Sequence, residues 1–380
     1  MSTLLTNVHL ISPDVNKKNQ AIFLENGKIS AILPEGAELP KADTTFDAKG
    51  KMAVPGFLDV HIHGGMGFES TCGKPEAIPA IAGGKLREGV TSWCPTTLTL
   101  GQDTLCDSLQ AIENYRRNPT AAKVIGTHLE GPYINPECIG AQNPAYVRKP
   151  NIEEVLQLNE ISPVSIVSFA PEMENALPFT KALLDNGITP SAGHTNATMA
   201  EFTKARKVGL RRLTHFCNQM TKLHHREIGL VGAGLYYDDV ACEMICDKIH
   251  LAPDMIRLAF KIKPIDKILL ISDAMEAAGL ADGDYQIGGL AVIVKDGAAR
   301  LKSTNALAGS TLKINVALKN IVEVTGLPIE QCIKATSWNQ ARNLGLQGLG
   351  KIEPGFTADI AILDDDFNVQ AVFVDGQQKI

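Results

Sequence analysis

Alternating apolar and polar positions divide the chain into two similar ends and a middle of different character. Near both ends, short apolar runs with a period of two are separated by turn residues, notably Asn26-Gly27 and Asp375-Gly376. This alternation, with a glycine in the turn, is typical of β-hairpins. We therefore predict that residues 1–52 and 348–380 together form one small β-sandwich domain with a structural role.

The middle of the chain, residues 53–347, alternates between short β-rich apolar runs and segments with helical periodicity. Strands are predicted at residues 53–61, 91–98, 123–130, 164–170, 189–194, 212–217, 241–247 and 267–273. Helices are predicted at residues 76–88, 105–115, 152–160, 176–186, 200–208, 253–260, 312–324 and 329–335, and a hairpin insertion at 285–301. Strands and helices alternating in this way indicate a (β/α)8 TIM barrel. The predicted fold class is therefore α/β, a barrel joined to the small β-sandwich.

Composition and charge limit the kinds of molecule that the protein is expected to bind. The 380 residues carry a net charge of −6 at pH 7, and 44% of them are hydrophobic. This balance argues against a nucleic-acid or acidic-membrane surface, although a local cation cluster could still bind a small anionic substrate. Because we find no run of about 18 apolar residues and no signal segment, we expect a cytoplasmic protein. The eight cysteines include no Cys-x-x-Cys pair and are expected to be buried thiols.

Residues that could carry chemistry gather where the predicted strands end, which is where barrel enzymes place their active sites. They are His61, His63, Glu130, His194, His215, His250 and Asp273. Taken singly, each has a structural alternative, such as a turn residue, a helix-capping acid or a core histidine. Residues two apart on a strand face the same side, so the rings of His61 and His63 can face one point. Taken together, these imidazoles and carboxylates are suitable ligands for a divalent cation.

A metal centre at the barrel mouth predicts a hydrolase. A bound divalent cation lowers the pKa of water toward neutrality and polarises a carbonyl group. Asp273, at the end of the eighth predicted strand, could take the proton of that water and hand it to the leaving group. The expected reaction is amide or ester hydrolysis. One or two cations are expected, and zinc, iron, nickel, cobalt and manganese all suit such ligands.

Several segments resemble the N-acetylglucosamine-6-phosphate deacetylase family of the amidohydrolase superfamily. The likeness covers nearly the whole chain and rests on HLEGPYINPECIGAQNP, SAGHTNATMAE, THFCNQMTKLHHREIGLVGAG, LISDAMEAAGL and LAGSTL. Glu130, in HLEGP, stands where dihydroorotase-like and hydantoinase-like relatives use a carboxylated lysine. The resemblance implies removal of the N-acetyl group from N-acetylglucosamine 6-phosphate by hydrolysis, giving glucosamine 6-phosphate and acetate.

The same resemblance implies roles for individual residues. The principal metal would be held by Glu130, His194 and His215, with Asp273 as the acid/base. Asn218 and Gln219 would meet the substrate. Arg226 and His250 would bind the phosphate, with His250 reaching in from the neighbouring subunit of a homodimer. His225 is a further candidate, although its loop could instead be merely exposed and basic.

The chain departs from some members of that family in two places. Some members lack the strand-one histidines and use one metal, whereas His61 and His63 are both present here. We therefore expect these two histidines to be ligands of a second metal, with Glu130 and Asp273 shared or adjacent. Others carry a histidine near the substrate acetyl group where this chain has Gln142, whose amide can donate a hydrogen bond but cannot carry a proton. The alternatives are an N-acetylgalactosamine-6-phosphate deacetylase, a hydrolase of cyclic amides, and an inactive barrel that serves as a binding module.

Overall fold

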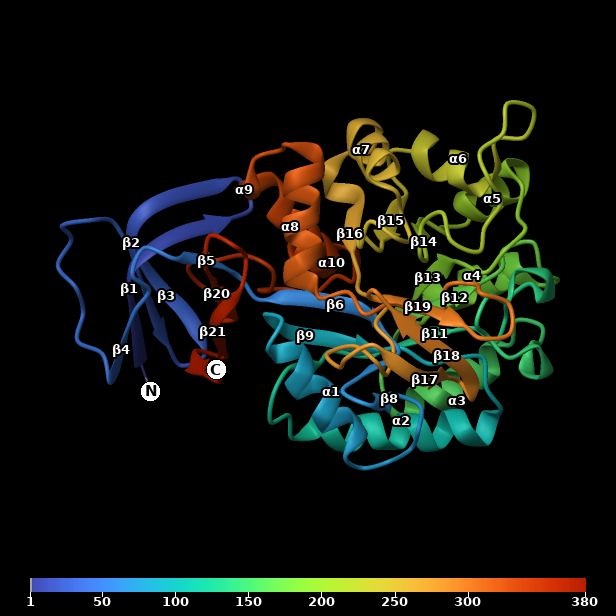
Figure 1. Cartoon of the computed structure of the whole chain (residues 1–380), viewed down its shortest axis with the longest axis horizontal. Helices are drawn as coiled ribbons and strands as arrows, with labels where there is room; N and C mark the ends of the chain where they lie inside the picture. Colours follow the sequence, from blue (N-terminus) through green and yellow to red (C-terminus); the bar gives the residue numbers. More distant parts are fainter. Residues whose placement is uncertain (1) are drawn as a thin grey trace.

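The two ends of the chain meet in one β-sheet. The computed structural model describes residues 2–380. The sheet contains β1 (Ser2–Ser12), β2 (Val15–Glu25), β3 (Lys28–Leu33), β4 (Thr44–Asp47), β5 (Met52–Pro55), β20 (Ile360–Leu363), β21 (Val369–Val374) and β22 (Gln377–Gln378). Its strand order is β22-β21-β20-β5-β1-β2-β3, and β4 pairs with β1. N-terminal and C-terminal strands therefore lie side by side at one end of the molecule (Figure 1).

Local turn chemistry explains the hairpins of this sheet. Asn26 and Gly27 both have positive φ, of 51° and 75°, and so do Asp375 and Gly376, of 48° and 75°. Two-residue hairpins favour this backbone, which Gly adopts without strain and Asn or Asp tolerates. Apolar side chains from both ends, including Ile22 and Phe373, pack in one cluster. The predicted hairpins are thus confirmed.

The middle of the chain is a curved parallel sheet with helices around it. A three-stranded part has the order β10-β9-β6, and a six-stranded part runs from β11 to β16. The strands are β6 (Phe57–Ile62), β9 (Val90–Pro95), β10 (Lys123–Val124), β11 (Thr127–Glu130), β12 (Val164–Phe169), β13 (Thr189–Ala192), β14 (Arg212–Leu213), β15 (Ala241–Met244) and β16 (Ile268–Leu270). Isolated parallel bridges, Thr96 with His128 and Ile62 with Ala274, connect the two parts. The mixed α/β class is therefore as predicted.

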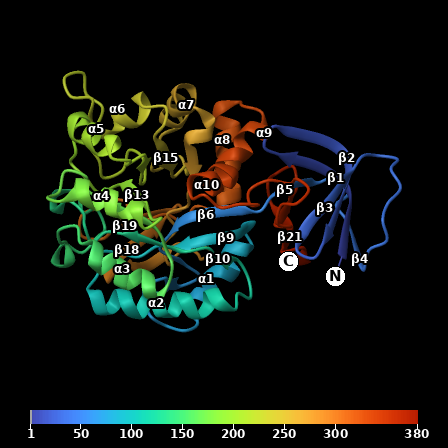
Figure 2. The ribbon, with the colours of Figure 1, turned by 180° about the vertical axis from the view of Figure 1, so that it is seen from behind.

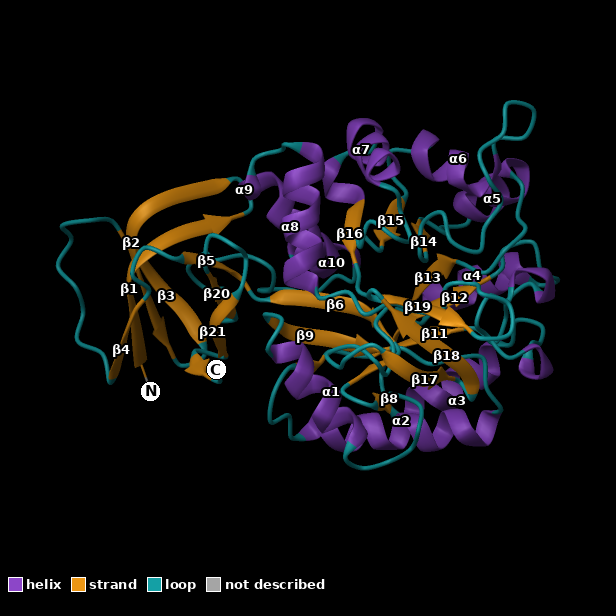
Figure 3. Cartoon of the chain, in the orientation of Figure 1, coloured by secondary structure: helices purple, strands orange, loops and turns teal. Residues whose placement is uncertain are grey.

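Helices pack around the curved sheet (Figures 2 and 3). They are α1 (Ala77–Leu86), α2 (Gln102–Arg117), α3 (Ile152–Ile161), α4 (Ala176–Asp185), α5 (Met199–Lys207), α6 (Gly229–Tyr236), α7 (Pro253–Ile262), α8 (Ile314–Thr325), α9 (Ile329–Cys332) and α10 (Trp338–Asn343). Local capping sets some of their starts: Thr198 and Glu201 form a capping box at α5. Among residues 2–380, none of the helices is both long and apolar enough to cross a membrane.

The structure differs from the sequence prediction in several elements. The predicted strand 53–61 is divided between β5, which pairs in the terminal sheet, and β6, and helix α10 was not predicted. The predicted strand 123–130 is divided into β10 and β11, with Gly126 between them at a φ of 148°. The predicted strand 212–217 is short, because the chain leaves the sheet after Leu213. Helix α6 was not predicted, since Gly229–Leu235 is buried on every side and therefore has no polar face to reveal its helical period.

The predicted hairpin insertion is a three-stranded antiparallel sheet. It comprises β17 (Gly283–Ile287), β18 (Leu290–Lys295) and β19 (Ala298–Leu301). The predicted turn at Asp296 and Gly297 joins β18 to β19. A small hairpin of β7 (Gly64–Gly65) and β8 (Phe68–Glu69) follows β6. The insertion adds Ile287 and Arg300 to the wall of the pocket described below.

Candidate metal centre and substrate pocket

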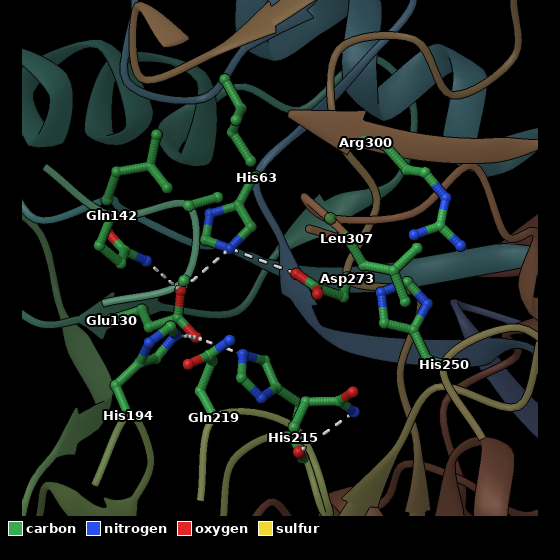
Figure 4. Close-up of a pocket in the computed structure, with 16 residues that line it drawn as sticks. His63, Glu130, Gln142, His194, His215, Gln219, His250, Asp273, Arg300 and Leu307 are labelled. Atoms are coloured by element: carbon green, nitrogen blue, oxygen red, sulfur yellow. Dashed lines mark hydrogen bonds and ion pairs between the residues drawn. The ribbon is translucent and has the colours of Figure 1, made fainter. Parts of the chain in front are cut away.

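The strand ends bring the predicted histidines and carboxylates together. Glu130 is the last residue of β11, His61 lies in β6, and His63 follows that strand directly. His194 and Asp273 follow β13 and β16 with φ of 49° and 52°. This left-handed conformation is uncommon outside glycine but several-fold enriched in Asp and His. It bends the backbone at both strand ends, and both side chains line the pocket (Figure 4).

The first group of side chains surrounds Oε1 of Glu130. His194 Nε2 lies 3.4 Å and His215 Nε2 3.3 Å from this oxygen. All three ligand atoms lie within 4.8 Å of one another, and all three side chains are buried. One carboxylate and two imidazoles at this spacing could hold a divalent cation.

A second group lies next to the first. His61 Nε2 and His63 Nε2 are 3.2 Å apart, and each lies 3.3 Å from Asp273 Oδ1. Glu130 also contacts this group, because its Oε1 is 3.4 Å from His61 Nε2 and its Oε2 is 3.1 Å from His63 Nε2. The Glu130 carboxylate therefore stands between two candidate cation positions (Figure 4).

Unpartnered buried atoms indicate that these residues suit a metal. Glu130 Oε1, His194 Nε2 and Asp273 Oδ1 are buried and have no hydrogen-bond partner within residues 2–380. Buried polar atoms normally have a partner, so such a cluster calls for an explanation. His194 Nδ1 donates to the carbonyl of Cys138 at 2.7 Å, which leaves the lone pair on Nε2. The donor set and its geometry therefore fit a divalent cation.

Mutual charge also shifts the pKa values of these groups. Burial alone would lower the pKa of His63, but hydrogen bonds and charges of Asp273 and Glu130 outweigh it and raise that pKa to about 10. The pKa of His215 rises to about 9, because contact with Glu130 outweighs burial in the same way. Burial would raise the pKa of Asp273, yet the charges of His61 and His63 lower it to about 2. Protons are therefore bound to ring nitrogens that a cation would also need. A divalent cation would compete with these protons for the same atoms.

Residues of both groups, with the exception of His61, line a pocket of about 330 Å³. Among the predicted substrate-binding residues, Gln142, Asn218, Gln219 and His250 line it. The Nε2 amide of Gln142 donates to Glu130 Oε2 at 2.6 Å, and its Oε1 accepts from the Thr99 backbone N–H at 2.6 Å. Gln142 therefore holds the carboxylate of the candidate metal centre as well as lining the pocket.

Two of the predicted phosphate ligands lie outside this pocket. Arg226 and His225 line a separate, exposed surface hollow, and Arg226 Nη1 donates to His225 Nε2 at 2.7 Å. His250 lines the pocket of its own chain, where the resemblance implied a residue from a neighbouring subunit. It is held there by Asp247, whose Oδ2 lies 2.6 Å from His250 Nδ1.

Three residues of interest were missed by the sequence analysis. Arg300 lines the pocket beside His250, from β19 of the insertion (Figure 4). Its place in an ordinary hairpin pattern gave no signal. Asp247 supports His250, and Glu243 contacts His61 Nδ1 at 3.1 Å. Glu243 did leave a trace, because a single acid inside the apolar run ACEMIC is unusual in a buried strand.

Comparisons with known proteins identify the family of the chain. Residues 52–379 match the amidohydrolase family. An N-acetylgalactosamine-6-phosphate deacetylase of Escherichia coli O157:H7 is 37% identical over 99% of both chains. An N-acetylglucosamine-6-phosphate deacetylase of Bacillus subtilis is 32% identical over 97% of this chain and 94% of its own. The structure of a Thermotoga maritima N-acetylglucosamine-6-phosphate deacetylase superimposes with a TM-score of 0.88 at 36% identity, over 99% of both chains. The resemblance read from the sequence is confirmed, and the chain belongs to the amidohydrolase family of hydrolases.

Proposed function

We propose that this chain hydrolyses the acetamide of N-acetylglucosamine 6-phosphate to glucosamine 6-phosphate and acetate. The observation that carries the proposal is the convergence of Glu130, His194 and His215 with Asp273 on the floor of one pocket. The Bacillus subtilis relative and the Thermotoga maritima structure, both named for this reaction, support the choice of substrate. An inactive binding module would not need to keep this complete set of ligands.

We propose that the first cation is held by Glu130, His194 and His215. The second position would be formed by His61, His63 and Asp273, with Glu130 between the two. Zinc, iron, nickel, cobalt and manganese all suit this mixture of imidazole and carboxylate. A divalent cation bound there would polarise the amide carbonyl and lower the pKa of the attacking water.

Asp273 is proposed as the group that moves the proton. Its low pKa keeps the carboxylate ionised at neutral pH, so it begins the reaction as a base. It takes one proton from the water as the oxygen adds to the carbonyl carbon. It then gives that proton to the sugar nitrogen as the carbon–nitrogen bond breaks, which leaves the free amine and acetic acid. The acid loses the second proton of the water to the solvent and departs as acetate. Asn218 and Gln219 line the same pocket and are proposed to orient the sugar.

Phosphate binding is proposed to use cations from two sources. His250 and Arg300 line the pocket of the same chain, and Arg300 Nη1 donates to the carbonyl of Asn305. Arg226 and His225 lie on the loop between β14 and α6, which projects from the molecule (Figure 1). We propose that this loop reaches the pocket of a second copy in a homodimer. A phosphate dianion would then meet guanidinium groups from both subunits.

N-Acetylgalactosamine 6-phosphate is the second candidate substrate, favoured by the Escherichia coli relative at 37% identity. The two sugars differ in the orientation of one hydroxyl group. Acetate release should be measured on both phosphates and on both unphosphorylated sugars. The proposal expects the highest kcat/KM on N-acetylglucosamine 6-phosphate. A higher value on the galactosamine phosphate would select the alternative, and a preference for unphosphorylated sugars would remove the roles of Arg226, His250 and Arg300.

We also propose an architecture that places this site. The parallel strands would form a complete (β/α)8 barrel over residues 53–347, since the isolated bridges join the two sheets at both edges. Residues 1–52 and 348–380 would form a separate β-sandwich domain, an arrangement supported by their shared apolar cluster. The pocket would then lie at the carboxyl ends of the barrel strands, as in other barrel enzymes.

A further inference from the structure

A fully buried ion pair lies next to the candidate metal centre. Arg212 of β14 and Glu243 of β15 are both 0% exposed. Arg212 donates from Nε at 2.8 Å and from Nη2 at 2.5 Å to Oε1 of Glu243, and its Nη1 donates to Asn343 on α10. Burying two charges is costly, and apolar residues of similar size would often be at least as stable. A pair retained in such a place therefore indicates a specific role.

The second oxygen of Glu243 faces the metal centre. Glu243 Oε2 lies 3.1 Å from His61 Nδ1. An ionised carboxylate only accepts hydrogen bonds, so the hydrogen of the neutral ring must be on Nδ1. The lone pair is then on His61 Nε2, the atom that lies 3.2 Å from His63 Nε2 and 3.3 Å from Asp273 Oδ1. Metal-binding histidines in proteins are commonly held by a carboxylate in this way.

The neighbouring His128 does not turn Glu243 into a ligand of a separate metal site. The rings of His61 and His128 are 4.6 Å apart, and both lie close to Glu243. His128 Nδ1 lies 3.0 Å from the Val60 carbonyl, which can only accept, so Nδ1 donates. His128 Nε2 then accepts from the Ser168 hydroxyl at 2.6 Å. Both ring nitrogens are thus used, and His128 offers no lone pair to a cation.

We infer that Glu243, itself held by Arg212, is a positioning residue that fixes the tautomer and ring orientation of His61 for binding a second divalent cation. The inference rests on the metal centre of the proposed function. It explains how a ligand of the second cation position is oriented. A histidine ligand of the first position is oriented by a different contact. There, His194 Nδ1 donates to the Cys138 carbonyl, which does not involve Glu243.

A matched pair of double variants separates positioning from charge. Arg212→Met with Glu243→Gln removes both charges but keeps an oxygen that can accept from His61 Nδ1. Arg212→Met with Glu243→Leu removes both charges and the acceptor. Substituting Glu243 alone would leave the Arg212 charge buried and unpaired, so it is not used. Metal-free proteins are dialysed against Mn²⁺ or Zn²⁺, bound metal per chain is measured by mass spectrometry, and the two affinities are measured by calorimetry.

We expect two cations per chain in the wild type and in the Gln double variant. In the Leu double variant the first affinity should be retained and the second weakened by about 10–100-fold, the usual effect of removing such a partner. His61→Ala with His63→Ala serves as the one-cation reference. Equal second-site affinity in the two double variants, loss of both sites in the Leu variant, or a single cation in the wild type would overturn the inference. A wild type that binds no cation would overturn the proposed metal centre as well.

A second measurement does not depend on whether the Arg212 and Glu243 double variants fold. Nitrogen-15 NMR of histidine-labelled, metal-free wild type distinguishes the two neutral tautomers of an imidazole. Assigned through the His61→Ala spectrum, His61 should carry its hydrogen on Nδ1 when the ring is neutral. Finding the hydrogen on Nε2 would contradict the role of Glu243, and this result does not depend on any catalytic assay.

Discussion

Gln142 donates a hydrogen bond of 2.6 Å from Nε2 to the same Glu130 carboxylate that separates the two candidate cation positions. Its other amide atom is fixed by the Thr99 backbone N–H. Here the amide cannot carry a proton, but it fixes one oxygen of the carboxylate and leaves the other facing His194 and His215.

Replacing Gln142 by Ala should therefore weaken the metal centre. The variant loses the donor to Glu130, and removal of such a partner costs about 10–100-fold in metal affinity. Calorimetric titration of the metal-free variant with Zn²⁺ measures this directly. Gln347→Ala, at an exposed position that does not line the pocket, is the matched control. Unchanged zinc affinity in Gln142→Ala would show that the hydrogen bond does not support the carboxylate.

Replacing Asp273 by Asn should separate metal binding from proton transfer. Asn keeps the shape of the side chain but cannot accept the proton of the attacking water. We expect turnover to fall by roughly 10²–10⁴-fold, the range for loss of a general acid/base. The cation held by Glu130, His194 and His215 should remain, as checked by metal analysis of the same preparation. Near-normal turnover would remove Asp273 from its proposed role.

Arg300→Met should impair binding of the phosphorylated substrate. A hydrogen bond to a charged group contributes about 1.5–3 kcal/mol, so KM should rise about 10-fold or more while kcat changes little. The unphosphorylated sugar should be almost unaffected, because it lacks the group that Arg300 is proposed to bind. Arg257→Met, on an exposed helix face, is the control. An equal effect on both sugars would assign Arg300 to another part of the substrate.

Mixing two impaired variants, assayed at a substrate concentration well below KM, tests whether Arg226 acts between subunits. Arg226→Met and Asp273→Asn are unfolded together and refolded, or co-expressed, so that mixed dimers form. In a mixed dimer, one pocket combines an intact Asp273 with the Arg226 of the other chain. Activity should therefore recover to roughly a quarter of the wild-type value, because half of the dimers are mixed and each has one complete pocket. No recovery, despite mixed dimers being isolated, would place Arg226 outside the partner's pocket.

Metal-free protein should become less stable as the pH rises above neutrality. In the folded state, partners of His63 and His215 raise their pKa values to about 10 and 9, from an ordinary value of 6.5. Between these values the folded state holds more protons than the unfolded state, so the free energy of unfolding falls with increasing pH. The stabilising contribution is complete below about pH 6.5 and is lost as the pH passes through 9–10.

Thermal unfolding of chelator-treated protein from pH 6.5 to 10 measures this dependence. Metal-loaded protein should show a smaller decrease in Tm, because the cation takes the place of the protons. His63→Asn with His215→Asn, also metal-free, should show a flatter profile than the wild type. A Tm that rises over this window in the metal-free wild type would contradict the assigned direction of the pKa shifts.

The sequence by itself located the candidate site residues that lie at the ends of strands. His61, His63, Glu130, His194, His215 and Asp273 could be placed because each follows or ends an apolar run. Backbone hydrogen bonds hold neighbouring parallel strands in alignment. Their carboxyl ends therefore lie at the same edge of the sheet, whatever the course of the connecting loops. The terminal hairpins could also be predicted from the sequence, since their turn residues specify the backbone locally. Helix α6 could not be predicted, because Gly229–Leu235 is apolar throughout and shows no helical alternation of apolar and polar residues.

Only the tertiary structure decided which loop residues reach the pocket. Arg300 enters it from an insertion far along the chain, His250 is turned inward by Asp247, and Arg226 projects away from it. The hydrogen bond between Gln142 and Glu130, and that between Glu243 and His61, likewise join separate elements. Such contacts depend on how distant segments pack rather than on a local repeat. A periodic pattern can therefore place a strand end, but it cannot say which side chains of other segments will meet it.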